Sequence, residues 1–142
     1  MALSSNNFKR TVISIVFIIL LLALMLSRVF RPSVSTSPQI SIIYNEAVHH
    51  IGTTAEVCGD VVSATFARNV GGQPTFINFG DDYPNQVFTV VIWGEYLTHW
   101  RTPPADLYSD RFVCARGRIT LHNDVPQIVV SQPDQISFSR RY

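Results

Sequence analysis

Charged side chains are scarce in this 142-residue chain, and lysine is nearly absent. Only 15% of the residues are charged, and Lys9 is the single lysine. Residues 32–142 hold seven arginines against ten acidic side chains, which gives this segment a formal charge of −3. Proteins that bind nucleic acids usually carry a positive balance, because neutralisation of phosphates supplies most of their affinity. The composition therefore disfavours a polyanionic ligand.

Motifs of the common catalytic and metal-binding classes are also missing. The sequence has no Gly-x-Ser-x-Gly, no phosphate-binding loop and no His-Glu-x-x-His. Its histidines lack the spacing of a metal-ligand set, and Asp81-Asp82 offers too few ligands for calcium. These four histidines are His49, His50, His99 and His122. We expect a protein that is not an enzyme and that has no metal site and no cofactor.

One long apolar run lies near the start of the sequence. From Thr11 to Ser27 the chain has no charged residue, no glycine and no proline. As a helix this run is about 25 Å long, near the lower limit for crossing a hydrocarbon core of ~30 Å. The favoured interpretation is an uncleaved membrane anchor that contacts lipid. A cleaved signal peptide is the alternative, although no small-x-small site follows the run directly.

The composition divides the chain into four parts. We expect an N-terminal head at 1–10, a transmembrane helix at 11–30, an extended linker rich in proline and serine at 31–40, and a folded domain at 41–142. Two basic side chains flank the apolar run on each side, so their number does not decide which end of the anchor lies in the cytoplasm. The predicted orientation is instead based on the short polar head and on the cysteines. The expectation is a single-pass protein of the cytoplasmic (inner) membrane, with its N-terminus in the cytoplasm and its domain on the periplasmic or extracellular side.

The hydrophobic pattern after the linker predicts one short helix and five strands. A helix is expected over 44–51, with Asn45 as N-cap and Gly52 as C-cap. Alternation and turn signals predict strands at 55–61, 74–79, 86–93, 111–121 and 126–130, with a short helical segment at 95–100. Glycines inside the first and fourth strands suit the tight coiling of a small closed barrel. The predicted fold class is therefore all-β.

Several short motifs follow one another in a fixed order over residues 44–138. They are Glu46-Ala47, Val57-Cys58-Gly59, Phe76-x-Asn78-x-Gly80, Tyr83-Pro84-Asn85, Phe88–Trp93 and Pro126–Val130. This order resembles that of bacterial OB-fold domains of the nucleic-acid-binding, anticodon-binding-like superfamily. The resemblance implies a five-stranded Greek-key barrel whose ligands lie across the second and third strands. It implies no catalytic residue.

The two cysteines lie in strands that are antiparallel neighbours in an OB barrel. Cys58 is in the first predicted strand and Cys114 is in the fourth. A disulfide between them is geometrically allowed where their α carbons come within about 7 Å, and it would favour an oxidising compartment. The alternative is that both are unrelated small apolar residues.

The third predicted strand, 86–93, is apolar on both sides. Phe88, Val90 and Ile92 would fill the barrel, so the opposite side either is covered within the chain or contacts a partner. The candidate binding face consists of Phe66, Arg68, Phe79, Val87, Thr89, Val91 and Trp93. Its aromatic rings are of the type that stacks on nucleic-acid bases.

Two functions are consistent with these features. The first is a non-catalytic, membrane-anchored accessory or scaffolding subunit that docks on a protein partner in a membrane complex. The second is binding of single-stranded nucleic acid or an oligosaccharide through the barrel face. The acidic excess and the absence of lysine in the domain favour the first function.

Overall fold

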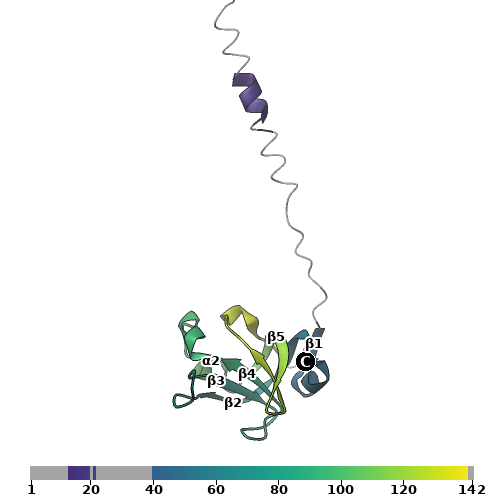
Figure 1. Ribbon diagram of the computed structural model, residues 1–142, viewed down its shortest axis with the longest axis vertical. Coiled ribbons are helices and arrows are strands. Elements are labelled where there is room, and N and C mark those ends of the chain that lie inside the picture. Colours follow the sequence, from purple (N-terminus) through teal and green to yellow (C-terminus); the bar gives the residue numbers. More distant parts are fainter. Residues whose placement is uncertain (1–12, 20, 22–39, 141–142) are drawn as a thin grey trace, which may run out of the picture. The chain divides into compact units, whose positions relative to one another are not determined.

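The computed structural model describes residues 13–19, 21 and 40–140 (Figure 1). The chain divides into two units, 1–37 and 38–142. In the first unit, residues 13–19 and 21 are helical. Among the described residues, no helix has both the length and the apolar character needed to span a membrane. Thr11 and Ser27, the two ends of the predicted anchor, lie outside the described residues, as does the predicted head.

The second unit is a closed barrel of five strands with short helices at its ends. Its elements are β1 (Ile40–Ile43), η1 (Tyr44–His50), β2 (Thr54–Phe66), β3 (Thr75–Phe79), β4 (Phe88–Ile92), η2 (Gly94–His99), α2 (Pro104–Tyr108), β5 (Phe112–His122), β6 (Val125–Val129), η3 (Pro133–Gln135) and β7 (Ile136–Phe138). The strands pair in the order β2-β3-β4-β6-β5, and β5 pairs back with β2. Only β4 and β6 run parallel among these five barrel strands. This is the five-stranded Greek-key topology of an OB-fold, and it confirms the predicted barrel.

The barrel interior is filled by alternate residues of each strand, as the pleat of a strand requires. Phe88, Val90 and Ile92 of β4 have no exposed surface, which confirms the predicted inward side of this strand. Their neighbours in the core include Ile77 of β3 and Ile128 of β6, which are also fully buried. The core therefore continues without interruption across β3, β4 and β6.

β2 closes the barrel because it pairs with a different strand along each half. Its first half pairs with β5, from Thr54 to Asp60, and its second half pairs with β3. The register shifts between Val61 and Ser63, which leaves Val62 as the extra residue of a bulge. A bulge bends a strand and increases its twist. The bend turns β2 from one partner strand to the other.

Gly117 is the glycine of β5 that the tight barrel requires. A Cβ atom there would lie 2.5 Å from Cγ2 of Ile128, closer than non-bonded carbons approach. Gly59 of β2 is similarly enclosed by the rings of Tyr44 and Phe79. Because neither glycine has a Cβ atom, neighbouring side chains occupy the space that a Cβ atom would fill.

Several elements differ from the sequence-based expectations. β1 and β7 were not predicted, because strands of four and three residues are too short for an alternation to be visible. β1 pairs in parallel with β2, so the expected linker ends before Ile40. The predicted helix over 44–51 is a 3₁₀ helix, and Ile43 rather than Asn45 is its N-cap. α2 was also not predicted, because Pro103 and Pro104 indicated only that the strand pattern is interrupted there.

The segment between β4 and β5 is held by a buried hydrogen bond. Nε1 of Trp100 donates to the hydroxyl of Tyr108 at 3.0 Å, and both side chains are buried. Burial raises the pKa of Tyr108, and the hydrogen bond from Trp100 partly opposes this shift. The bond satisfies the indole N–H, which would otherwise be an unpaired buried donor.

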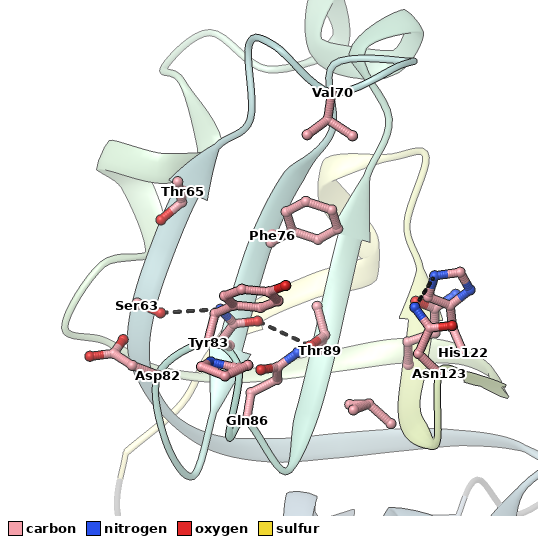
Figure 2. A pocket seen from close by; sticks show the side chains of 14 residues that line it. Ser63, Thr65, Val70, Phe76, Asp82, Tyr83, Gln86, Thr89, His122 and Asn123 are labelled. Atoms are coloured by element: carbon pink, nitrogen blue, oxygen red, sulfur yellow. Dashed lines mark hydrogen bonds between the residues drawn. The ribbon is translucent and has the colours of Figure 1, made fainter.

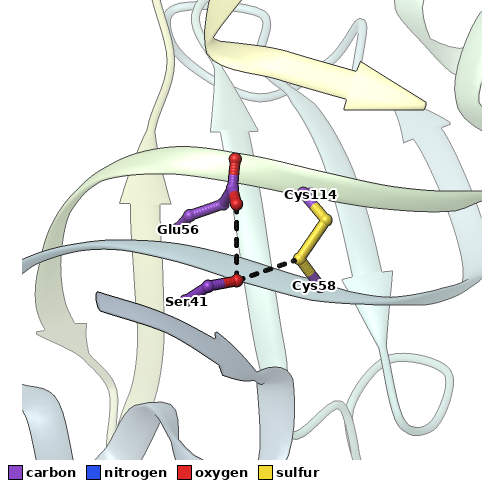
Figure 3. The surroundings of a disulfide bond; sticks show 4 residues. All are labelled: Ser41, Glu56, Cys58 and Cys114. Atoms are coloured by element: carbon purple, nitrogen blue, oxygen red, sulfur yellow. Dashed lines mark hydrogen bonds between the residues drawn. A yellow bond between two sulfur atoms is a disulfide. The ribbon is translucent and has the colours of Figure 1, made fainter. Parts of the chain in front are cut away.

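The predicted disulfide is present and joins β2 to β5 (Figure 3). Cys58 and Cys114 are directly paired in the antiparallel ladder, and their α carbons are 4.0 Å apart. Oγ of Ser41 in β1 lies 3.8 Å from Sγ of Cys58. The bond is therefore a covalent cross-link at the seam where the barrel closes.

Reduction of this disulfide is expected to lower the free energy of unfolding by about 4 kcal/mol, because the bond restricts a loop of 56 residues in the unfolded chain. Denaturant unfolding of the full chain, with and without a dithiol reductant, measures this change. The double variant Cys58→Ala/Cys114→Ala is the control, since its midpoint cannot respond to the reductant. An unchanged midpoint in the wild type after complete reduction would contradict the expectation.

Candidate functional site

A groove of about 990 Å³ runs across the outer side of the barrel (Figure 2). Its floor comes from outward-facing residues of β2, β3, β4 and β6. Its rim comes from the β2–β3 loop at Val70, the β3–β4 loop at Tyr83 and the β5–β6 turn at Asn123. The groove is thus built on a rigid sheet and bordered by loops on several sides.

Strand register arranges the floor in two parallel rows. Ser63, Asn78, Thr89 and Gln127 are paired in sequence across β2, β3, β4 and β6, and they form what we call the polar row. Thr65, Phe76, Val91 and Val129 are paired in the same way and form the second row, of which Thr65 and Phe76 line the groove. The two rows lie two residues apart along each strand. A ligand along the groove would therefore meet the polar row beside the ring of Phe76.

Hydrogen bonds give the polar row a direction. Nδ2 of Asn78 donates to Oγ of Ser63 at 3.2 Å, and Oγ1 of Thr89 donates to Oδ1 of Asn78 at 3.0 Å (Figure 2). Asn78 and Thr89 are each only 5% exposed, so the bond between them is buried, whereas the bond from Asn78 to Ser63 is partly buried. The row leaves the hydroxyl hydrogen of Ser63 to donate and the lone pairs of Thr89 to accept.

Gln86 supplies an unused acceptor beside this row. Its side chain lines the groove, and its Oε1 atom is buried with no hydrogen-bond partner among the described residues. A buried acceptor left unpaired costs about 1–3 kcal/mol. A donor from a ligand would remove this cost, so Gln86 is a candidate binding residue.

The groove carries little charge. Asp82 is the acidic residue of the lining, and neither lysine nor arginine is among the described residues that line it. Arg68, a member of the predicted face, is exposed, and its guanidinium lies 6.0 Å from the ring centroid of Phe66 outside the groove lining. Arg116 lies on β5 opposite Glu56, where β5 pairs with β2. Neither Arg68 nor Arg116 is therefore among the described residues that line the groove.

The structure does not bring the seven predicted face residues together. Thr89 alone among them lines the groove. Val87 packs on Gly80 in the β3–β4 loop, and Trp93 packs on Gly72 in the β2–β3 loop. Phe66 is paired with the buried Thr75, so it belongs to the inward set of β2, although it is 37% exposed at the strand end.

Phe79 requires a correction. It has no exposed surface, and its ring lies edge-on to that of Phe88 with centroids 5.4 Å apart. The reason is strand alternation, since Phe79 pairs with the inward Phe88. A ring in the core cannot stack on a ligand.

The second side of β4 is buried at Thr89 and Val91. Thr89 and Val91 are 5% and 2% exposed, because β4 lies between β3 and β6 and their side chains flank it. Val91 is paired with Phe76 on one side and with Val129 on the other. This side of the strand is therefore covered within the barrel, which was one of the two alternatives left open by the sequence.

Sequence reasoning missed most of the groove, including Ser63, Asn78, Gln86 and Gln127. Asparagine is depleted in strands, so Asn78 inside an apolar strand is a signal that could have been used. The place of Asn78 in the groove follows only from the strand register, which pairs it with Ser63 on β2 and with Thr89 on β4.

One group of potential metal ligands occurs within the described residues. Glu56, Cys58 and Cys114 have ligand atoms within 4.8 Å of one another. The two sulfurs are bonded to each other, so neither is a thiolate that could bind a metal ion. The group is better described as the surroundings of the disulfide (Figure 3).

Two solved structures that match this chain share little sequence with it. No protein-family model matches the chain, and no curated protein matches it. A crystal structure described as an aspartyl-tRNA synthetase from Leishmania major matches with a TM-score of 0.45 and 10% identity, over 76% of this chain and 22% of that one. The chain thus corresponds to about a fifth of that synthetase. The engineered OBody AM1L10, bound to hen egg-white lysozyme, matches with a TM-score of 0.49 and 18% identity, over 75% of this chain and 100% of that one. At these scores neither match carries an argument about function.

Replacing Phe79 by alanine is expected to lower the free energy of unfolding by about 3–5 kcal/mol, because it leaves a cavity in the core. Phe66→Ala is the matched control, and a smaller loss is expected because this ring is partly exposed. Denaturant unfolding of both variants measures the difference. Equal losses would contradict the assignment of Phe79 to the core.

Proposed function

We propose that this protein is a non-catalytic binding module, tethered to a membrane, that holds an uncharged, extended ligand in the groove across β3, β4 and β6. The observation that carries the proposal is the lining of the groove. It combines a hydrogen-bonded polar row, a buried acceptor without a partner at Gln86, and no lysine or arginine among the described lining residues.

Nucleic acid is the less favoured ligand under this proposal. A bound polyanion needs cationic side chains to replace its counterions. The groove offers Asp82 instead, and residues 32–142 carry a formal charge of −3. An oligosaccharide is the other polymer in the second function considered from the sequence. An uncharged oligosaccharide needs no cationic side chains, and neither Asp82 nor the formal charge of −3 repels it.

The tether and the location are part of the proposal. The apolar run from Thr11 to Ser27 supports a single-pass anchor in the cytoplasmic membrane, surrounded by lipid. The disulfide between Cys58 and Cys114 supports a domain that faces an oxidising compartment, outside the cytoplasm. Under this arrangement the groove meets ligands on the outer side of the membrane.

Docking on a protein partner, as an accessory or scaffolding subunit, is the second candidate function. The second side of β4 does not support this function, because Thr89 and Val91 are covered within the barrel. Its support is now the segment 40–51, in which Ile40, Ile43 and Val48 are 46–51% exposed. Exposed apolar side chains that follow one another closely are typical of protein contacts.

Site-specific photo-crosslinking in cells that make the protein naturally tests the groove as the binding site. A photoreactive phenylalanine analogue in place of Tyr83, which is 80% exposed at the rim, is expected to give covalent adducts of higher mass. The same analogue in place of Arg116, which is exposed on β5 outside the groove lining, serves as the control and is expected to give none. Adducts at Arg116 but not at Tyr83 would contradict the proposal.

Membrane association is tested separately by fractionation. The full chain is expected to stay in the membrane pellet after an alkaline carbonate wash, because a transmembrane helix is held by apolar burial rather than by charge. Deletion of residues 11–30 is expected to move the protein into the soluble fraction. Release of the full chain by carbonate would show that the apolar run does not act as an anchor.

A further inference from the structure

We propose that the ligand of the groove is a chain of N-acetylated hexosamine sugars. This inference rests on the proposed function, since it names the chemical class that the same groove accepts. It is argued from the polar row, from Gln86 and from the two aromatic rings of the groove.

The polar row matches the hydrogen-bonding capacity of sugar hydroxyls. At one end Ser63 can donate a hydrogen, and further along the row Thr89 can accept one, because Asn78 fixes the direction of the bonds between them. A hydroxyl group both donates and accepts, so neighbouring hydroxyls of one sugar can satisfy both ends. The side-chain amide of Gln127 extends the row on β6, where it offers a further donor and a further acceptor.

Gln86 and the second row point to an acetamido group in particular. The buried Oε1 of Gln86 has no partner and needs a donor. An acetamido N–H supplies that donor and carries a methyl group next to it. Phe76, which Figure 2 draws between Val70 and Gln86, lines the same groove and provides apolar surface for a methyl group. A sugar without the acetamido group would leave the acceptor of Gln86 without a donor.

Two aromatic rings offer stacking surfaces. Figure 2 shows the rings of Phe76 and Tyr83 along the open side of β3, one on the floor and one from the β3–β4 loop. The C–H faces of a pyranose ring are apolar and pack on aromatic rings. Two such rings along the groove suit a chain of sugars rather than a single one.

Other polymers fit these groups less well. A nucleic acid brings phosphates toward Asp82 and finds no cation in the described lining. An extended peptide offers N–H and C=O groups for Gln86 and the polar row, but its backbone has no hydroxyl groups that both donate and accept. We therefore treat peptide and nucleic-acid binding as outcomes that would overturn the inference.

The experiment is isothermal titration calorimetry with the full chain in phosphatidylcholine nanodiscs, which contain no sugar. The probe is the β-1,4-linked tetramer of N-acetylglucosamine. We expect saturable binding, and we expect the glucose tetramer with the same linkage to bind at least about tenfold more weakly, as one lost hydrogen bond with its apolar contact implies.

Gln86→Leu is the decisive variant. It removes an acceptor that has no partner in the described structure, so it is expected to leave the unfolding midpoint unchanged or raised. Its affinity for the tetramer of N-acetylglucosamine is expected to fall at least about tenfold. Asn45→Leu, at an exposed position on η1 outside the groove lining, is the control and is expected to bind like the wild type.

The results separate the two proposals. No binding of the N-acetylglucosamine tetramer at about 5 mM, or equal affinity for both tetramers, overturns the sugar inference. Binding of a twelve-residue thymidine oligonucleotide or a neutral Gly/Ser/Asn peptide, weakened by Gln86→Leu, also overturns it but leaves the groove as a binding site. The proposed function itself is contradicted only by the crosslinking experiment, if the analogue at Arg116 gives adducts and the analogue at Tyr83 gives none.

Discussion

Closure of the barrel along β2 is the constraint on which the other features depend. β2 pairs with β5 from Thr54 to Asp60 and with β3 from Val61 to Phe66, so this one strand joins the two edges of the sheet. The disulfide between Cys58 and Cys114 fixes the first half of this strand to β5. The bulge then sets which residues of the second half point outward. Ser63 and Thr65 reach the groove because of this shift, since without it Val62 and Ala64 would take their places.

The same alternation that fills the core also builds the groove. Phe88, Val90 and Ile92 face inward, and Thr89, which lies between Phe88 and Val90, forms part of the floor. Because β4 is central among β3, β4 and β6, its outward side chains are shielded by their neighbours, and a short polar one can be held in a hydrogen bond. The groove thus acquires a fixed floor without charged residues. Its rim is formed by loops, which can vary without disturbing the core.

The sequence predicted the architecture better than the site. The turn signals, the strong strand over 86–93 and the cysteine pairing depend on local pattern and on the order of strands, and the structure confirms them. The binding face depends on register, which single-strand patterns do not contain. Phe79 was assigned to the face because aromatic residues commonly bind ligands, but its pairing with Phe88 places it in the core. Asn78 and Gln86 acquire a role only from neighbours that are distant in sequence.

Hydrogen–deuterium exchange of the full chain in nanodiscs, with and without the tetramer of N-acetylglucosamine, tests the central claim most directly. The account predicts that added tetramer slows exchange in β3, in β4 and in the turn between β5 and β6, and leaves β1, η1 and β7 unchanged. Slower exchange confined to β1 and η1, or no change in the strands that form the groove floor, would contradict it.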